Sequence, residues 1–155
     1  SGTGSWQKVY FEPAFAAGQL PALFLTVQSN NGSQAVATRV RNLDGKGFEA
    51  ALYEEEALTD GHAVEQLAYL AVYNATGSGT LALNGQSIAY SLHRLSLGEQ
   101  WQAVSGQEVK LEEEQSRDGE TGHVLENTDV LLIDDWLFAQ PVSFFGPDTV
   151  APRTR

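Results

Sequence analysis

An antiparallel all-β sandwich is the fold that this sequence predicts. Apolar and polar residues alternate along 7–11 and 36–41, and the apolar runs 23–27 and 129–133 have the length of buried strands. Turn-forming pairs rich in Asn, Asp and Gly separate such segments at intervals of roughly 8–12 residues, which is typical of sandwiches and barrels. One pair, Asn84-Gly85, lies between two short apolar segments and predicts a two-residue hairpin.

One segment is ambiguous between helix and strand. Residues 63–72 could form a short helix by propensity alone, but Tyr69, Leu70 and Val72 suit a strand equally well. Because strand signals dominate the rest of the chain, we expect a strand at 66–72.

Length and composition restrict the class of protein. The 155 residues fit a single sandwich domain at 6–155, with residues 1–5 as a linker or non-native remnant and two related blocks at about 6–75 and 76–155. The sequence contains no run of about 18 apolar residues, so membrane insertion is not expected. The net charge of −11 would repel a polyanion, so nucleic acid is not an expected partner. The absence of cysteine excludes disulfides and thiol catalysis.

The chain repeats an acidic block. Residues 54–65 carry Glu54-Glu55-Glu56, then Asp60-Gly61, His62 and Glu65. Residues 112–126 carry the same residue types in the same order, namely Glu112-Glu113-Glu114, Asp118-Gly119, His123 and Glu126. The loop of this second copy is three residues longer. Repetition of a whole block indicates a repeated structural unit.

A second repeat matches residues 23–41 to residues 137–155 without a gap, so that Arg39 and Arg41 correspond to Arg153 and Arg155. A weaker echo relates Trp6-Gln7 to Trp101-Gln102. The arginine segment precedes the acidic block in the first half and follows it in the second. Either one half is permuted, or residues 137–155 open a further copy.

The acidic blocks are candidate calcium sites, because clustered carboxylates supply the oxygen ligands that calcium takes. The alternative is a solvated acidic edge strand, which discourages pairing between sheets. The candidate ligands are Glu54, Glu56 and Asp60 in the first block and Glu112, Glu114 and Asp118 in the second.

The two His-x-x-Glu pairs fit a metal site only on a helix, because residues three apart on a strand point to opposite faces. We expect these side chains to hydrogen-bond the loop that follows Asp-Gly and to fix its shape in both copies. His62, Glu65, Asp60 and His123 are kept as candidate ligand-binding residues.

Arginines and aromatic residues complete the candidate binding set. Arg39 and Arg41 alternate on one strand, so both point to the same face, and Arg153 repeats the pattern. A guanidinium recognises hydroxyls or a carboxylate, but it can equally pair with a glutamate across the sheet. Trp6, Trp101, Trp136 and Tyr53 are candidate platforms for sugar rings, with packing in the core as the alternative.

Residues 6–72 resemble an H-type lectin domain. The pattern consists of Trp6-x-x-Val9-x-Phe11, Phe15, Pro21, the apolar strand 23–27, Arg39-Val-Arg41-Asn42, Gly47-Phe48 and a closing strand that ends in Tyr69-Leu70-Ala71-Val72. The resemblance implies an antiparallel β-sandwich that forms trimers and binds N-acetylgalactosamine-type sugars near subunit contacts. It also implies that Arg39, nine residues before Phe48, contacts sugar.

The expected function is therefore a carbohydrate-binding module of a secreted or cell-surface bacterial protein, with a glycan or polysaccharide as ligand. The chain has no nucleophile elbow, P-loop or dinucleotide fingerprint, so no enzymatic activity is expected. The alternative is a calcium-stiffened structural repeat of a large surface adhesin without a glycan site.

Overall fold

A computed structural model describes residues 5–155 except 56, 58–60, 121 and 147. The described residues form twelve strands and no helix, and every strand pairing is antiparallel. The predicted all-β antiparallel class is confirmed. Within the described part of the chain, therefore, no helix offers the long apolar stretch that crossing a membrane would need.

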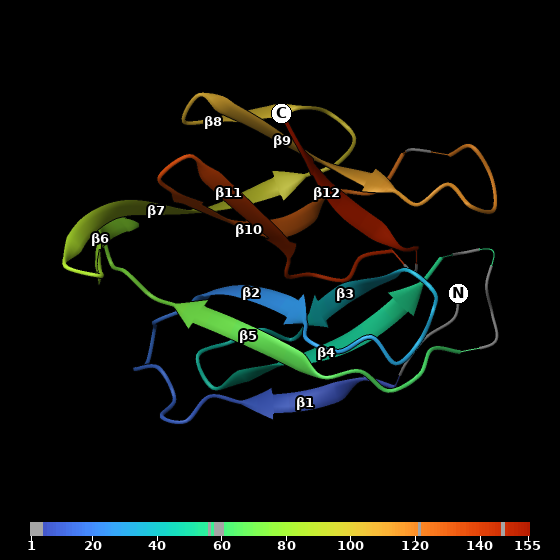
Figure 1. The fold of residues 1–155 in the computed structure, drawn as a ribbon, viewed down its shortest axis with the longest axis horizontal. Coiled ribbons are helices and arrows are strands. Elements are labelled where there is room, and N and C mark those ends of the chain that lie inside the picture. Colours follow the sequence, from blue (N-terminus) through green and yellow to red (C-terminus); the bar gives the residue numbers. More distant parts are fainter. Residues whose placement is uncertain (1–4, 56, 58–60, 121, 147) are drawn as a thin grey trace.

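The first half of the chain forms two facing sheets (Figure 1). One sheet has the order β1-β4-β3, and the other pairs β2 with β5. Both contribute to one apolar cluster around Leu23, Val40 and Phe48, all of which are buried. The strand bounds are β1 Gln7–Tyr10, β2 Ala22–Val27, β3 Val36–Arg41, β4 Gly47–Glu54 and β5 Leu67–Val72.

The second half forms its own pair of sheets, with the orders β12-β9-β8 and β11-β10-β7-β6. Both contribute to a second apolar cluster around Leu97, Leu111 and Val130. Each half therefore has a hydrophobic core between two layers. The strand bounds are β6 Ser78–Leu83, β7 Gln86–Leu97, β8 Gln102–Val104, β9 Gln107–Glu113, β10 Glu126–Ile133, β11 Trp136–Pro141 and β12 Val150–Thr154.

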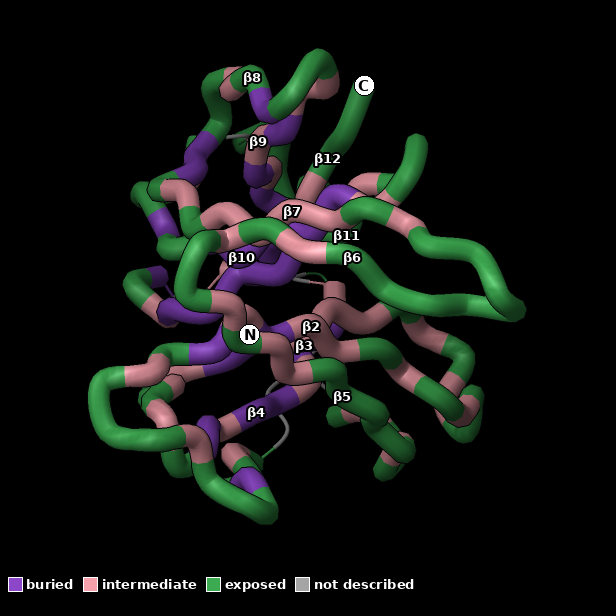
Figure 2. Tube along the Cα trace, turned by 90° about the vertical axis from the view of Figure 1, so that its left-hand side faces the viewer, coloured by how far each residue is buried: buried purple, intermediate pink, exposed green. Residues whose placement is uncertain are grey.

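The predicted hairpin is present between β6 and β7. Asn84 and Gly85 have φ of 50° and 78°, the two positive values that a type I′ turn requires. Within the ambiguous segment 63–72, residues Leu67–Val72 form strand β5, so a strand is present where one was expected. Figure 2 shows that β5 and the β6–β7 hairpin are exposed along most of their length.

Corresponding strands of the two halves pair in the same register. Val36 of β3 is opposite Glu54 of β4, and Val150 of β12 is opposite Glu113 of β9. Glu54 therefore corresponds in the structure to Glu113 and not to Glu112, with which the sequence repeat had matched it. In the same way β1 pairs with β4 as β8 pairs with β9, and β2 pairs with β5 as β11 pairs with β10. Residues 137–155 therefore complete the sheets of the second half.

The acidic blocks do not lie on edge strands. Glu54 ends β4 and Glu113 ends β9, and each of these strands is the middle strand of its sheet. Glu54 is 1% exposed and Glu113 is 8% exposed. The interpretation of the blocks as solvated edge strands is therefore wrong for these two glutamates, because a middle strand has neighbours on both sides.

Side chains of the second half accept hydrogen bonds from backbone N–H groups on the unpaired edge of β2. The Leu23 backbone N–H donates to Asp129 Oδ2 at 2.9 Å, and the Leu25 N–H donates to Gln140 Oε1 at 3.3 Å. Arg94 holds Asp129 through two bonds of 2.6 and 2.8 Å. Because buried backbone groups must be paired, these contacts fix β2 against β10 and β11.

Candidate functional site

Two sets of residues, which we call the His–Glu clamps, occupy corresponding places in the two halves. In the first clamp, Glu65 accepts hydrogen bonds from Ser29 Oγ at 2.5 Å and from the Gly32 N–H at 2.9 Å, and its Oε1 lies 3.1 Å from His62 Nε2. Glu65 therefore closes the loop that follows β2. The prediction that the His-x-x-Glu pairs fix the loop after Asp-Gly is wrong in its choice of loop, because Glu65 holds residues 29–32, which come from another part of the chain.

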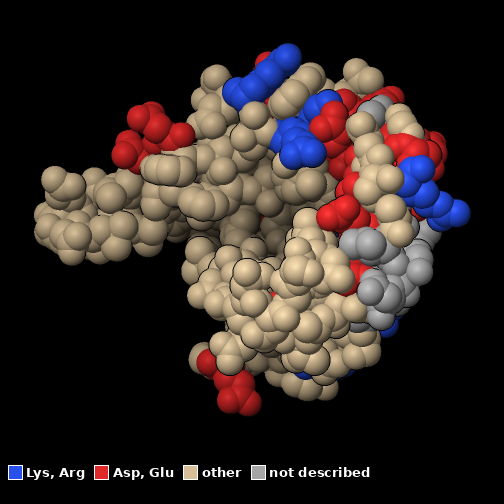
Figure 3. All heavy atoms as spheres, turned by 45° about the vertical axis from the view of Figure 1, so that its right-hand side comes forward, with Lys and Arg blue, Asp and Glu red and all other residues tan. Residues whose placement is uncertain are grey.

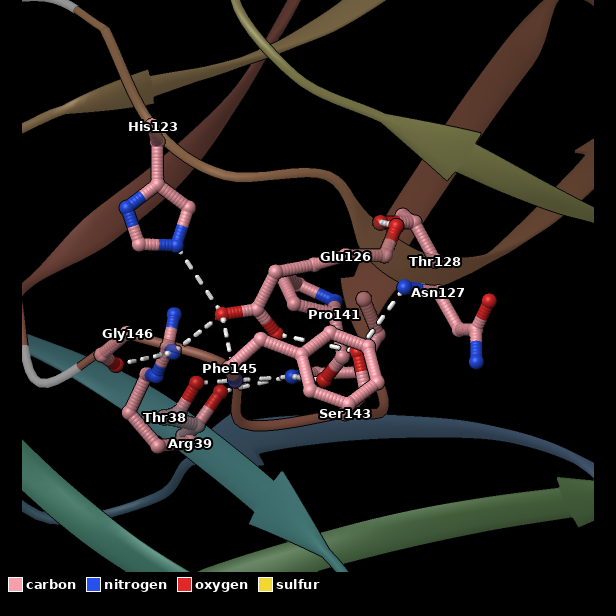
Figure 4. Close-up of polar contacts among 11 residues, drawn as sticks. Thr38, Arg39, His123, Glu126, Asn127, Thr128, Pro141, Ser143, Phe145 and Gly146 are labelled. Atoms are coloured by element: carbon pink, nitrogen blue, oxygen red, sulfur yellow. Dashed lines mark hydrogen bonds and ion pairs between the residues drawn. The ribbon is translucent and has the colours of Figure 1, made fainter.

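The second clamp uses the corresponding residues (Figure 4). Glu126 accepts a hydrogen bond from Ser143 Oγ at 3.1 Å, and its Oε1 lies 2.9 Å from His123 Nε2. The Phe145 N–H donates to the same carboxylate at 3.4 Å. Glu126 therefore closes the loop after β11 as Glu65 closes the loop after β2.

A glycine packs against the histidine in each clamp. A Cβ on Gly146 would lie 2.8 Å from His123 Cε1, and a Cβ on Gly32 would overlap the His62 ring. Glycine is the one residue that leaves room for the imidazole there, which explains its place in both copies of the loop.

Hydrogen bonds lower the pKa of both clamp glutamates. The Ser29 hydroxyl, followed by the Gly32 and Asn31 N–H groups, lowers the pKa of Glu65 to about 2. Burial acts to raise the pKa of Glu126, but the hydrogen bond from His123 and the charge of Arg39 outweigh it and hold the pKa below its usual value. Both carboxylates are therefore ionised at neutral pH.

Arg39 is a structural residue that joins the two halves. Its guanidinium Nη2 lies 2.5 Å from Glu126 Oε1 and donates to the Gly146 carbonyl at 3.1 Å (Figure 4). Both Arg39 and Glu126 are 0% exposed. The predicted contact of Arg39 with a ligand is not compatible with this burial, so the alternative of pairing with a glutamate applies. The glutamate is Glu126, however, and not a member of either run of three glutamates.

Arg41 and Trp6 come together at the surface of the first half, with Glu49 as the third member. The Arg41 guanidinium lies 4.2 Å from the centre of the Trp6 ring, and its Nε donates to Glu49 Oε2 at 2.6 Å. That hydrogen bond lowers the pKa of Glu49. The Arg41 side chain is 39% exposed, so this set can reach a ligand.

The second half has the same set, formed by Trp101, Arg155 and Glu108. The Arg155 guanidinium lies 4.3 Å from the Trp101 ring centre, and its Nε donates to Glu108 Oε2 at 2.7 Å. Lys110 also lies over Trp101, at 5.0 Å. We call these two arrangements the Trp–Arg–Glu sets.

The other candidate residues have separate places. Arg153 donates to Glu112 at 3.0 Å and contacts neither tryptophan, and Tyr53 is buried against Phe144. Trp136 begins β11 and is 68% exposed. Asp60 lies outside the described residues.

The predicted calcium ligands are not gathered into one site. Glu112 is paired with Lys110 and Arg153, while Glu114 accepts hydrogen bonds from Ser116 and Asp118 accepts one from the Glu120 N–H. Glu54 is buried beside His62. Glu56 lies outside the described residues, as does Asp60.

A polar hollow in the second half contains a group that the sequence did not predict. Ligand atoms of Glu113, His123 and Asp148 lie within 4.8 Å of one another. Figure 3 shows many acidic side chains, intermixed with basic ones, on the side of the molecule away from the protruding arm, and further acidic groups beside the arm and at the bottom of the view. The alternation of side chains along a strand is a sequence signal that places Glu113 on the opposite face from Glu112 and Glu114. The part played by Asp148 depends on the tertiary fold.

Comparison with known proteins gives no match to a family model, to a curated protein or to a solved structure. The candidate sites are therefore interpreted from their own residues.

The buried pair of Arg39 and Glu126 predicts unequal effects for two arginines at corresponding sequence positions. Arg39→Ala should lower the free energy of unfolding by about 3–5 kcal/mol, because it leaves a buried carboxylate without its cation. Arg153→Ala should change it by less than about 0.5 kcal/mol, because Arg153 is 59% exposed. Urea denaturation measures both. Equal effects would contradict the structural role of Arg39.

The low pKa of Glu65 predicts a dependence of stability on pH. The carboxyl has a pKa of about 2 in the folded chain and about 4.3 when unfolded. Its contribution to stability is therefore present above about pH 4.3 and is lost as the pH falls towards 2. Glu65→Gln should flatten the loss of stability between pH 4.5 and 2 in acid titrations of the melting temperature, whereas the exposed control Glu99→Gln should leave it as in the parent. An unchanged acid transition in Glu65→Gln would speak against the clamp.

Proposed function

We propose that this chain is a non-enzymatic, carbohydrate-binding recognition module, lectin-like in its use of arginine and tryptophan, from a secreted or cell-surface protein. One observation carries the proposal: the Trp–Arg–Glu set occurs twice, in corresponding places of the two halves, at the surface. Residues 6–72 contribute the first set, within the segment that resembles H-type lectins.

The chemistry of each set suits a sugar. The guanidinium offers several N–H donors in a fixed plane, and the glutamate beside it offers acceptors, so that neighbouring hydroxyls find both partners. The C–H face of a pyranose ring packs on an aromatic ring in the same way as other apolar groups. Trp6 also makes an edge contact with Phe144, at 5.1 Å between ring centres.

Each arginine also makes contacts inside its set that favour one orientation of its side chain. The arginine is fixed by the ring below it and by a hydrogen bond of 2.6 or 2.7 Å to the glutamate. Less side-chain freedom then remains to be lost on binding, which favours affinity. Two equivalent sites on one chain also favour binding to a polysaccharide, because the second contact forms at a high effective concentration.

The proposal extends to the architecture. The two halves would be copies of one unit in permuted chain order, since their strands pair in the same register. The H-type lectin fold and a homotrimer belong to the same proposal.

A calcium-stiffened structural repeat of a surface adhesin, without a glycan site, is the second candidate. The observation in its favour is that both His–Glu clamps use their repeated residues to close loops within the chain. This candidate predicts no glycan ligand at all.

A glycan and polysaccharide array separates the two candidates. The parent should bind at least one glycan, and Arg41→Ala combined with Arg155→Ala should weaken that binding about tenfold or more, because no other group replaces the guanidinium forks. Arg153→Ala is the matched control, since its side chain is 59% exposed and that of Arg155 is 58% exposed.

The melting temperature of the double variant should fall by only a few degrees, since each of the two exposed cation–π contacts contributes only about 0.5–1 kcal/mol. An array without hits, or a double variant that binds as the parent does, would overturn the proposal.

A further inference from the structure

We propose that Glu113, His123 and Asp148 form a site for one divalent transition-metal ion, of which Zn²⁺ is the representative. The site lies in the polar hollow of the second half, apart from the Trp–Arg–Glu sets, and does not depend on carbohydrate binding. Three segments meet there: the end of β9, the loop before β10 and the loop before β12.

A carboxylate fixes the orientation of His123, as is common for histidines that bind metals. His123 Nε2 lies 2.9 Å from Glu126 Oε1, and Glu126 is itself fixed by Arg39 and Ser143 (Figure 4). A carboxylate on one ring nitrogen sets the tautomer and the orientation of a metal-binding imidazole and leaves the other nitrogen for the metal. The His123 side chain is 1% exposed, so its ring is held away from bulk solvent.

The two carboxylates are placed to meet that ring. One oxygen each from Glu113 and Asp148 and one nitrogen of His123 all lie within 4.8 Å of one another. Ligands at about 2.1 Å from a tetrahedral ion are about 3.4 Å apart, so a modest closing movement of the side chains brings them into range. Gly146 permits the approach, because a Cβ there would lie 2.8 Å from His123 Cε1 and 3.6 Å from Asp148 Oδ2.

The donor set selects the class of ion. Calcium takes six to eight oxygen ligands, whereas one imidazole nitrogen with two carboxylates suits Zn²⁺ and its neighbours. Asp118 and Glu120 line the same hollow and add negative potential, although Arg117 opposes it. A metal site of this kind differs from the calcium site that the acidic blocks suggest.

The first half provides an internal contrast. His62 Nε2 is held by Glu65, and His62 Nδ1 lies 3.2 Å from Glu54 Oε1, so the histidine and two glutamates recur. In the repeat, however, Gln34 takes the position of Asp148, so that the third carboxylate is missing. We therefore expect one ion per chain.

Titration calorimetry of the tag-free chain with Zn²⁺, and separately with Ca²⁺, tests the site. The parent should bind one equivalent of Zn²⁺ and should bind Ca²⁺ at least tenfold more weakly. Asp148→Asn should weaken Zn²⁺ binding by about tenfold or more, because it removes a charged ligand from a set of three. The matched control Asp135→Asn, an exposed position in the β10–β11 turn, should bind as the parent does.

Absorption of the Co²⁺-loaded chain gives a second measurement that does not depend on affinity. A visible d–d spectrum in the parent and in Asp135→Asn, lost or shifted in Asp148→Asn, would show that Asp148 is a ligand of the ion. The proposal is overturned if the parent shows no saturable Zn²⁺ binding, if Asp148→Asn binds with unchanged affinity and spectrum, or if Ca²⁺ binds more tightly than Zn²⁺.

Discussion

The ion pair between Arg39 and Glu126 is the contact on which the arrangement of the two halves depends. Both side chains are completely buried, and they come from β3 in the first half and the start of β10 in the second. Taking two charges out of water costs several kcal/mol for each ion, which only close pairing and further hydrogen bonds offset. Glu126 accepts further hydrogen bonds from the Ser143 hydroxyl and the Phe145 N–H. The same carboxylate therefore closes the loop after β11 and joins the two halves.

Arg39 is less completely satisfied than its partner. Its Nε and Nη1 have no hydrogen-bond partner among the described residues, and the Phe144 ring lies 4.9 Å from the guanidinium carbon. Such a group is expensive to bury, since unpaired buried donors lose their hydration. The pair therefore specifies how the halves meet more than it adds to net stability.

The sequence repeat predicts contacts inside each half and fails for contacts between them. The Trp–Arg–Glu sets and the His–Glu clamps recur because all their members belong to one half. Arg39 and Arg153 match in sequence, yet one is buried against the other half and the other is 59% exposed. The burial of Arg39 depends on a partner 87 residues away along the chain, which the sequence repeat does not reveal.

Secondary structure could be predicted from the sequence where it depends on local signals, namely the alternation of apolar and polar residues and the residues preferred in turns. The Asn84-Gly85 hairpin is an example. The acidic blocks were harder to place. Three consecutive glutamates look solvated, but strand alternation and a middle position in the sheet bury Glu54 and Glu113. The cluster with Asp148 needed the tertiary fold, because its members come from three separate segments.

A double-mutant cycle on Arg39 and Glu126 tests the central claim most directly. Arg39→Met, Glu126→Gln and the double variant would be compared with the parent by the free energy of unfolding in urea. Direct pairing predicts a coupling energy of about 1–3 kcal/mol, as for groups within one buried network. A coupling within about 0.5 kcal/mol of zero would show that the two side chains act independently, and the halves would then have to be held together by other contacts.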